Sequence, residues 1–287
     1  LQKLLKSLYL NIMPRTFENV LKTNSKTFYV ASRLLPRYIR DDVFKIYSFC
    51  RLYDDNVDLD RSDDTNDLEE YILKLGIDGN VIRELKNGIN SDINRSGIEN
   101  LDELLTYSYK VAGCVGLMMC DVLSIKDSSA RYYAIDLGIA MQLTNICRDV
   151  LTDHRDGRVY LPSDMIRGNE ISSMTDDELI SVIVRLINLA DEYYDSAIDG
   201  IKFIPIRSRF SILYALRLYQ AIGHKIVKNS QKYFKEKINT SYSDKVIIFM
   251  KTCLEFVFML LKLQKNKKHN QSLHKPLHGL PYVNEKI

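Results

Sequence analysis

The chain contains little glycine and little proline. Its 287 residues include 12 Gly and 6 Pro, the residue types that most often break helices and form tight turns. Their scarcity argues against a β-sandwich, a β-barrel or a linker-rich array, and it favours long helices. Hydrophobic residues make up 46% of the chain, which is enough apolar material for one large core. We therefore expect an all-α, single-domain helical bundle.

Several other features are also missing. The formal net charge is only +3, so we expect no nucleic-acid partner. The five cysteines form no CxxC pair and are interpreted as reduced, buried thiols of an intracellular protein. The five histidines are scattered or lie near the C-terminus, so no Cys/His metal site is expected. The apolar run at 243–263 is interrupted by Lys251 and Glu255, which favours a core or interfacial helix over a membrane span.

The two ends of the chain differ from its middle. Residues 1–22 are basic and amphipathic, which predicts either a helix that ends near Pro14 or the remnant of a targeting segment. Residues 23–265 would form the helical domain, and residues 266–287 a basic, mobile tail. The expected location is intracellular, soluble or peripheral to a membrane, with organellar targeting left open.

Two segments inside the helical domain carry local signals. Residues 101–123 predict an apolar helix, in which Gly113 and Gly116 would allow a neighbouring helix or a ligand to approach closely. Residues 175–178 form a capping box that predicts the start of a long amphipathic helix.

Polar side chains form one stripe on a predicted helix at residues 130–153. Gln142, Asn145, Asp149 and Asp153 follow one another at steps of three, four and four, which places them on one helical face. The residues between them are apolar. This pattern is unusual for a solvated surface and is typical of the wall of a metal-lined cavity.

A second stripe lies on a predicted helix at residues 40–58. Tyr47, Arg51, Asp54 or Asp55, and Asp58 recur at helical spacing, and the opposite face is apolar. Alone, this pattern would be interpreted as a solvated surface, which is the usual case for two aspartates at this spacing.

Together, the two stripes predict a particular chemistry. Two carboxylates about 6 Å apart repel each other by roughly 3 kcal/mol at an effective dielectric constant of 20, so a cluster of them requires cations. Oxygen ligands, including the amide of Asn145, favour Mg²⁺, with Mn²⁺ as a possible substitute. Arg51, Arg148 and Arg158 lie close by in the sequence, and guanidinium groups match phosphate geometry. The combination predicts a diphosphate that leaves a carbocation in an apolar, aromatic cavity.

At these residues the chain resembles the squalene/phytoene synthase family of head-to-head prenyl transferases, over roughly residues 20–235. The resemblance is carried by four motifs, at residues 25–28 with 34–36, 47–58, 107–116 and 142–162. Their form is closest to phytoene and dehydrosqualene synthases.

The resemblance implies an isoprenoid-synthase-type bundle around a central cavity, and it implies a role for particular residues. The implied metal ligands are Asp54, Asp58, Asn145, Asp149 and Asp153. The implied catalytic residues are Tyr47, Asp54, Asp58, Tyr107, Gln142, Asp149, Asp153 and Tyr219. The implied substrate-binding residues are Ser25, Phe28, Arg51, Asp55, Val111, Gly113, Asn145, Arg148, Arg158 and Tyr160.

The implied reaction joins two allylic prenyl diphosphates through a cyclopropylcarbinyl diphosphate, with two geranylgeranyl diphosphates giving phytoene. A small residue at Ser32, if it faced the cavity, would leave room for such long chains. No NADPH requirement is expected for phytoene or dehydrosqualene. Peripheral membrane contact is expected because the product is insoluble in water. Oligomeric state is left open.

Three alternatives stay open. One is a C30 dehydrosqualene or squalene synthase that uses farnesyl diphosphate. Another is a class I terpene cyclase. The third is a non-catalytic relative that acts as a scaffold or assembly factor, because residues 59–106 are shorter than the family pattern by about one long helix.

Overall fold

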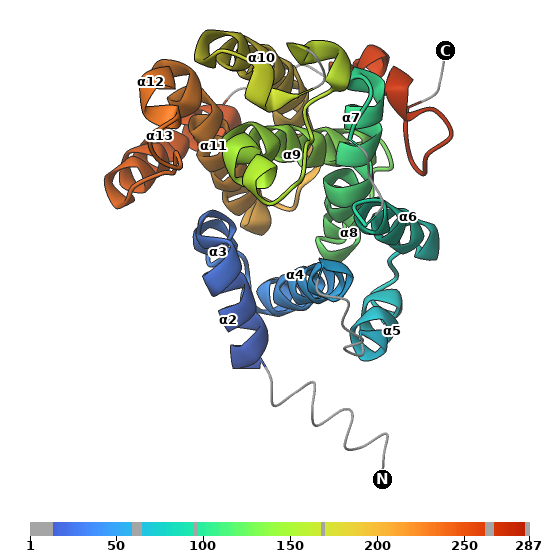
Figure 1. Cartoon of the computed structure of the whole chain (residues 1–287). Coiled ribbons are helices and arrows are strands. Elements are labelled where there is room, and N and C mark those ends of the chain that lie inside the picture. The colour runs from blue at the N-terminus through green and yellow to red at the C-terminus, as the bar shows by residue number, and fades with distance from the viewer. Residues whose placement is uncertain (1–13, 59–64, 94–96, 168–169, 262–266, 285–287) are drawn as a thin grey trace.

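The chain folds as a bundle of α-helices (Figure 1), as expected. The computed structural model describes residues 14–58, 65–93, 97–167, 170–261 and 267–284. These residues form no β-sheet and contain one isolated bridge, between Ile98 and Pro162. In chain order the helices are α2 (Pro14–Asn24), α3 (Lys26–Ser32), α4 (Arg37–Asp58), α5 (Asn66–Lys74), α6 (Gly79–Asn90), α7 (Leu101–Ser108), the π-helix η1 (Tyr109–Gly113), α8 (Cys114–Val122), α9 (Ala130–Arg155), α10 (Asp176–Gly200), α11 (Ile206–Lys228), α12 (Ser230–Tyr233) and α13 (Tyr242–Leu261). The 3₁₀ turns are η2 (Ser163–Met165), η4 (Ile171–Ser173), η5 (Ile201–Phe203) and η6 (Gln271–Leu277).

Local sequence signals place several of these boundaries. The side chain of Thr175 accepts from the backbone N–H of Glu178, whose carboxylate accepts in return from Thr175, so a capping box starts α10 as predicted. The expected continuous helix over 101–123 is instead interrupted by the π-helix η1. Such widened turns often lie at functional sites, and Val111 and Ala112 of η1 line the cavity described below.

Helix α9 runs through the middle of the bundle, with α8, α10 and α11 packed around it (Figure 1). Two glycines allow the close approach. A Cβ on Gly116 would lie 2.1 Å from the carbonyl oxygen of Ala134, and a Cβ on Gly138 would lie 2.3 Å from that of Ala112. The expected packing role of the glycines on this helix is therefore confirmed at Gly116.

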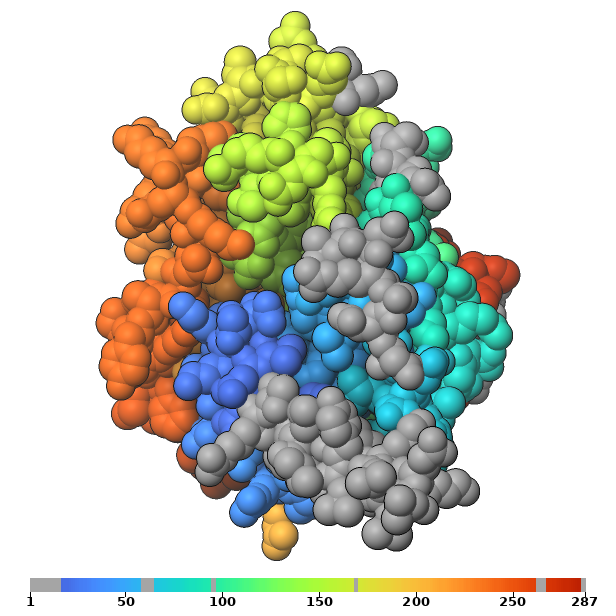
Figure 2. Space-filling view, turned by 60° about the horizontal axis from the view of Figure 1, so that its bottom comes forward, coloured from blue at the N-terminus to red at the C-terminus, as the bar shows by residue number. Residues whose placement is uncertain are grey.

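The two ends of the described chain lie against the bundle. Helix α3 packs on α11 and against α13, shown as blue beside orange in Figure 2. The helix expected before Pro14 lies outside the described residues. In the described part, no helix has the length and apolar content needed to cross a membrane.

The expected mobile tail is wrong for residues 267–284, which we call the C-terminal strap. Leu273, His274 and Leu277 are buried, and η6 packs on α7. The basic composition suggested a solvated segment, but two of its leucines, Leu273 and Leu277, are buried in the bundle.

Candidate active site

An apolar cavity of about 290 Å³ lies between α3, α4, η1, α8, α9, α10 and α11. Seven residues that the sequence analysis selected line it, from five separate elements: Ser25, Phe28, Tyr47, Val111, Gln142, Asn145 and Tyr219. The helices that carry the two polar stripes therefore contribute to one cavity.

The cavity has a polar end and an apolar end. Cys50 and Asn145 line it, and Asp54 and Asp149 follow one helical turn later on the same faces of α4 and α9. Both carboxylates therefore lie one helical turn from a residue of the cavity wall. At the apolar end are Ala130 and other apolar residues, and the stretch of α9 from Ala130 to Asn145 is about 22 Å long at the usual helical rise. An elongated apolar chain with a charged head fits this shape.

On α4, one arginine neutralises two aspartates. Arg51 donates from Nε to Asp55 at 3.2 Å and from Nη1 to Asp54 at 3.1 Å. All three side chains are about one-third exposed, so they are accessible to a ligand. Asp58 is the last residue of α4, and its side chain lies outside the described part of the structure.

On α9, Asp149 has two cationic partners. Arg148 donates to it from Nε at 3.0 Å, and Nζ of Lys237 lies 2.7 Å away. Burial would raise the pKa of Asp149, but the hydrogen bonds from Arg148 and Lys237 outweigh it and hold that pKa below its usual value. The sequence analysis missed Lys237, which follows α12 and has no helical spacing to either stripe.

Asp153 has the opposite electrostatic environment. Burial raises the pKa of its carboxyl to about 7, and the neighbouring charge of Asp149 adds to the rise. Gly157, at a φ of +77°, turns the chain after α9 so that the backbone N–H of Arg158 donates to the carbonyl oxygen of Asp153. This turn brings the Arg158 charge close enough to oppose the rise in pKa.

The carbonyl oxygen of the Asn145 side chain is buried and has no hydrogen-bond partner among the described residues. A buried polar atom without a partner costs about 1–3 kcal/mol, so this oxygen is available to accept a bond from a ligand. Together with the partly desolvated carboxyl of Asp153, this oxygen fits a hard divalent cation. The donor set predicted from the sequence is therefore chemically suited to Mg²⁺.

The predicted tyrosines divide into two groups. Tyr47 and Tyr219 line the cavity, where burial raises the pKa of Tyr47 to about 12, and the hydroxyl of Tyr219 lies 3.4 Å from Ser25 Oγ. Tyr107 does not line the cavity. Its ring stacks on Tyr160 at 5.3 Å, and its hydroxyl donates to Asp92 at 2.9 Å.

Two other selected residues lie outside the cavity wall. A Cβ on Gly113 would meet the ring of Tyr109 within its own turn. Ser32 is buried, and its hydroxyl donates to the carbonyl oxygen of Tyr29. Because Ser32 is not among the lining residues, the argument that it leaves room for a longer chain is wrong.

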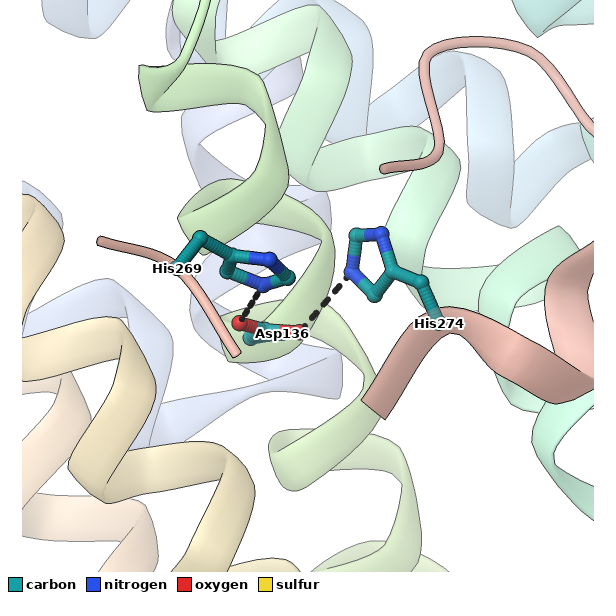
Figure 3. A group of neighbouring side chains, drawn as sticks. All are labelled: Asp136, His269 and His274. Carbon is teal, nitrogen blue, oxygen red and sulfur yellow. Dashed lines mark hydrogen bonds and ion pairs between the residues drawn. The ribbon is translucent and has the colours of Figure 1, made fainter. Parts of the chain in front are cut away.

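A second buried polar group lies behind the cavity, and the sequence analysis missed it. The carboxylate of Asp136 on α9 lies between the imidazoles of His269 and His274 from the C-terminal strap (Figure 3). The histidines were judged to be scattered, because nothing in their spacing points to an aspartate more than 130 positions earlier. We call these three residues the Asp136 cluster.

Comparisons with known proteins show what the whole chain is similar to. The family model "Squalene/phytoene synthase" matches residues 21–75 and 65–243. A 15-cis-phytoene synthase from Paracoccus sp. is 35% identical, over 80% of this chain and 88% of the relative. The enzyme of the same name from Enterobacter agglomerans is 30% identical, over 80% and 91%. The crystal structure of a dehydrosqualene synthase superposes with a TM-score of 0.78 at 24% identity, over 88% of this chain and 99% of that one.

Proposed function

The chain belongs to the squalene/phytoene synthase family, and we propose that it joins two allylic prenyl diphosphates head to head through a cyclopropylcarbinyl diphosphate. The observation that carries the proposal is that α4 and α9, the two helices that bear these carboxylates and arginines, both line a single apolar cavity. The relatives named 15-cis-phytoene synthase favour geranylgeranyl diphosphate as substrate and phytoene as product. A C30 product from farnesyl diphosphate is the alternative.

We propose Asp54, Asp58, Asn145, Asp149 and Asp153 as ligands of Mg²⁺, with Mn²⁺ as a substitute. The unpartnered oxygen of Asn145 and the raised pKa of Asp153 support this assignment. When bound, the ions would neutralise the negative charge of a leaving diphosphate.

The protein's own residues would have three tasks. Arg51, Arg148 and Arg158 would hold diphosphate oxygens through guanidinium hydrogen bonds. The apolar walls would exclude water from the carbocation, while the ring faces of Tyr47 and Phe28, whose centroids lie 6.2 Å apart, would stabilise its positive charge. The high pKa of Tyr47 keeps its hydroxyl protonated, so it would not be consumed as a base. Gln142, which lines the same space, would orient the first-formed intermediate.

We also propose that α13 contacts a membrane surface. Exposed apolar side chains follow one stripe of α13, with 44–76% of each side chain accessible: Val246, Ile247, Met250, Leu254, Val257, Phe258 and Leu261. On its other face, Phe256 and Met259 pack against a cluster that includes Leu123 and Ile204 of the cavity wall. Helix α13 would thus lie between the lipid and the cavity that holds an apolar substrate.

Product identification tests the proposed activity. The protein is incubated with Mg²⁺ and with farnesyl or geranylgeranyl diphosphate, each offered alone, and the hydrocarbons are identified by mass spectrometry. We expect a head-to-head C40 hydrocarbon without added NADPH, and an Asp149→Ala variant that folds but forms no product.

Other outcomes would favour the alternatives. A C30 product would transfer the assignment to farnesyl diphosphate, and a cyclised product from one substrate molecule would indicate a terpene cyclase. No turnover by folded protein, together with a melting temperature unchanged by Mg²⁺ and a diphosphate analogue, would support the non-catalytic scaffold, because a specific ligand must stabilise the folded state.

A further inference from the structure

The C-terminal strap is held to the bundle mainly through its backbone. Four hydroxyl groups of the bundle donate to its carbonyl oxygens: Tyr133 to Lys267 at 3.1 Å, Tyr193 to Leu273 at 2.7 Å, Thr106 to Pro276 at 3.1 Å and Tyr109 to Pro281 at 2.5 Å. These donors come from α7, η1, α9 and α10, so the strap fixes several helices at once. Such an arrangement gives the strap a defined position relative to the cavity.

The Asp136 cluster also holds the strap to the bundle, through hydrogen bonds to the carboxylate of Asp136. Nε2 of His269 lies 2.8 Å from Oδ2 of Asp136, Nε2 of His274 lies 3.0 Å from Oδ1, and Ser196 donates to Oδ2 at 2.5 Å. Asp136 and His274 are fully buried. Burial would raise the pKa of Asp136, but the hydrogen bonds from the two histidines outweigh it, so the pKa lies below its usual value.

The hydrogen bonds also indicate that the Asp136 cluster holds the strap in place and does not bind a metal. The backbone N–H of Asn284 points at Nδ1 of His274, at 2.8 Å. Because a backbone N–H can only donate, Nδ1 must accept, and the proton of the neutral imidazole lies on Nε2 and faces Asp136. A metal-binding imidazole has the opposite polarity, with its lone pair toward the metal and its other nitrogen donating outward.

One residue connects the strap to the cavity. Tyr133 lines the apolar end of the cavity on one side, and on the other it lines the outer groove formed by the strap. Its ring stacks on Phe203 at 5.7 Å and meets the edge of His269 at 5.2 Å. It also lies directly on Gly200, where a Cβ would come within 2.2 Å of Tyr133 Cβ. The tyrosine ring is therefore the partition between the cavity and the groove behind it.

We propose that Tyr133 is the floor of the prenyl-chain cavity, and that the strap, fastened by the Asp136 cluster, holds this floor in place and thereby sets the maximum length of the substrate. The inference rests on the proposed function, because it assumes that a prenyl chain fills the cavity. It assigns chain-length selection to the far end of α9 and to the C-terminal strap.

The test compares wild-type protein with Tyr133→Ala, using farnesyl, geranylgeranyl and geranylfarnesyl diphosphates. We expect Tyr133→Ala to raise kcat/KM for the diphosphate one isoprene unit longer than the preferred one, relative to the preferred one, by at least about tenfold. Tyr133→Phe, which keeps the ring, should retain the wild-type ratio. Tyr214→Ala is the matched control, because Tyr214 is also buried and donates to a backbone carbonyl, that of Lys245, but does not line the cavity.

A second pair of variants tests the strap. His274→Phe and His269→Phe should increase hydrogen exchange at residues 267–284 and raise the same ratio, by less than Tyr133→Ala does. Normal circular dichroism shows that the rest of the bundle is intact.

The outcomes separate this proposal from the proposed function. No product from wild-type protein with any of the three diphosphates rejects the proposed function itself. If wild-type protein is active and Tyr133→Ala leaves the kcat/KM ratio between the longer and the preferred diphosphate unchanged, Tyr133 is not the floor of the cavity. Faster exchange of the strap with an unchanged ratio in the histidine variants rejects the role of the strap.

Discussion

At the scale of single residues, two neighbouring polar side chains of α9 differ in their hydrogen bonding. The buried carbonyl oxygen of Asn145 lacks a partner among the described residues, while the adjacent Thr144 hydroxyl is bonded to Ala140 and Tyr194. The two residues therefore contribute differently to stability. The Thr144 hydroxyl stabilises the fold through its hydrogen bonds, whereas the Asn145 oxygen is left available to a ligand.

This contrast gives a prediction for Asn145→Leu. Removal of an unsatisfied buried polar group should leave the free energy of unfolding unchanged or raise it by about 1 kcal/mol, while product formation falls at least about 100-fold. Denaturant titration of ligand-free protein and initial rates measure the two effects. Thr144→Val is the control, and it should lower the free energy of unfolding by about 1–2 kcal/mol. A loss of stability in Asn145→Leu equal to that of Thr144→Val would contradict the assignment.

A second prediction concerns pH. The hydrogen bond to Asp191 raises the pKa of His224 above its usual value, although burial opposes the rise. A raised pKa means that the pair stabilises the fold below about pH 6.5, the unfolded value, and that this contribution disappears as the pH rises through the folded pKa. Because the His224 side chain is 56% exposed, the effect should be about 0.5 kcal/mol or less.

The measurement is the difference in free energy of unfolding between wild-type protein and His224→Gln at pH 5.5 and at pH 8. The difference should be larger at the lower pH. Equal differences at the two pH values would show that folding does not change the pKa of His224.

At the scale of elements, the sequence was most informative where residues repeat at helical spacing or form a helix-capping motif. The stripes on α4 and α9 were predicted because polar residues at helical spacing interrupt apolar ones, and the capping box located the start of α10. The π-turn η1, which lies against Gly138 of α9, was not predicted. Lys237 and the histidines of the strap were missed because only tertiary packing brings them to their partners.

Packing between α8 and α9 gives the third prediction. Gly116→Ala should gain about 1 kcal/mol in helix propensity but lose more through the clash with the Ala134 carbonyl, so we expect a net destabilisation of about 2 kcal/mol. Gly79→Ala at the start of α6 is the control, because the nearest atom to its Cβ would be 3.9 Å away. Thermal unfolding compares the two variants. A Gly116→Ala protein as stable as wild type would show that the two helices are not held this closely.

At the scale of the whole molecule, the exposed stripe of α13 predicts membrane binding. Wild-type protein should float with lipid vesicles, more strongly with anionic than with neutral lipid because Lys251 is exposed on the same helix. The triple change Ile247→Gln, Met250→Gln and Leu254→Gln should lower the membrane partition coefficient by about 1,000-fold or more if all three side chains insert fully, because each contributes about 1.5–3 kcal/mol. The control replaces Leu73, Ile93 and Val227, which are exposed at scattered places, with Gln.

A different result would change the interpretation of this surface. If the triple change converts a stable dimer into monomers and leaves flotation unaltered, the stripe of α13 is an interface between two copies of the chain.

The class of the whole fold was predictable, but the way in which its C-terminal strap packs on the bundle was not. Low glycine and proline content and the two polar stripes were enough to predict an all-α bundle and to select two of the helices that line its cavity. The position of the last described residues was not, because a basic segment with few apolar residues resembles a solvated tail. Its order comes from hydroxyl groups of Tyr133, Tyr193 and Tyr109, whose partners are backbone carbonyls and leave no trace in the sequence of the strap.

The ion pairs of the two motifs have a thermodynamic consequence. Arg51 is occupied by Asp54 and Asp55, and Arg148 by Asp149, so each motif carries its own counterions. Under the proposed ligand assignment, an arginine would become available to a diphosphate when its aspartates bind a cation, and the aspartates would become available when the arginine binds a diphosphate. Cation and diphosphate would then each increase the affinity for the other, with the same coupling free energy in both directions. Such a site would respond to the two ligands together more strongly than to either one alone.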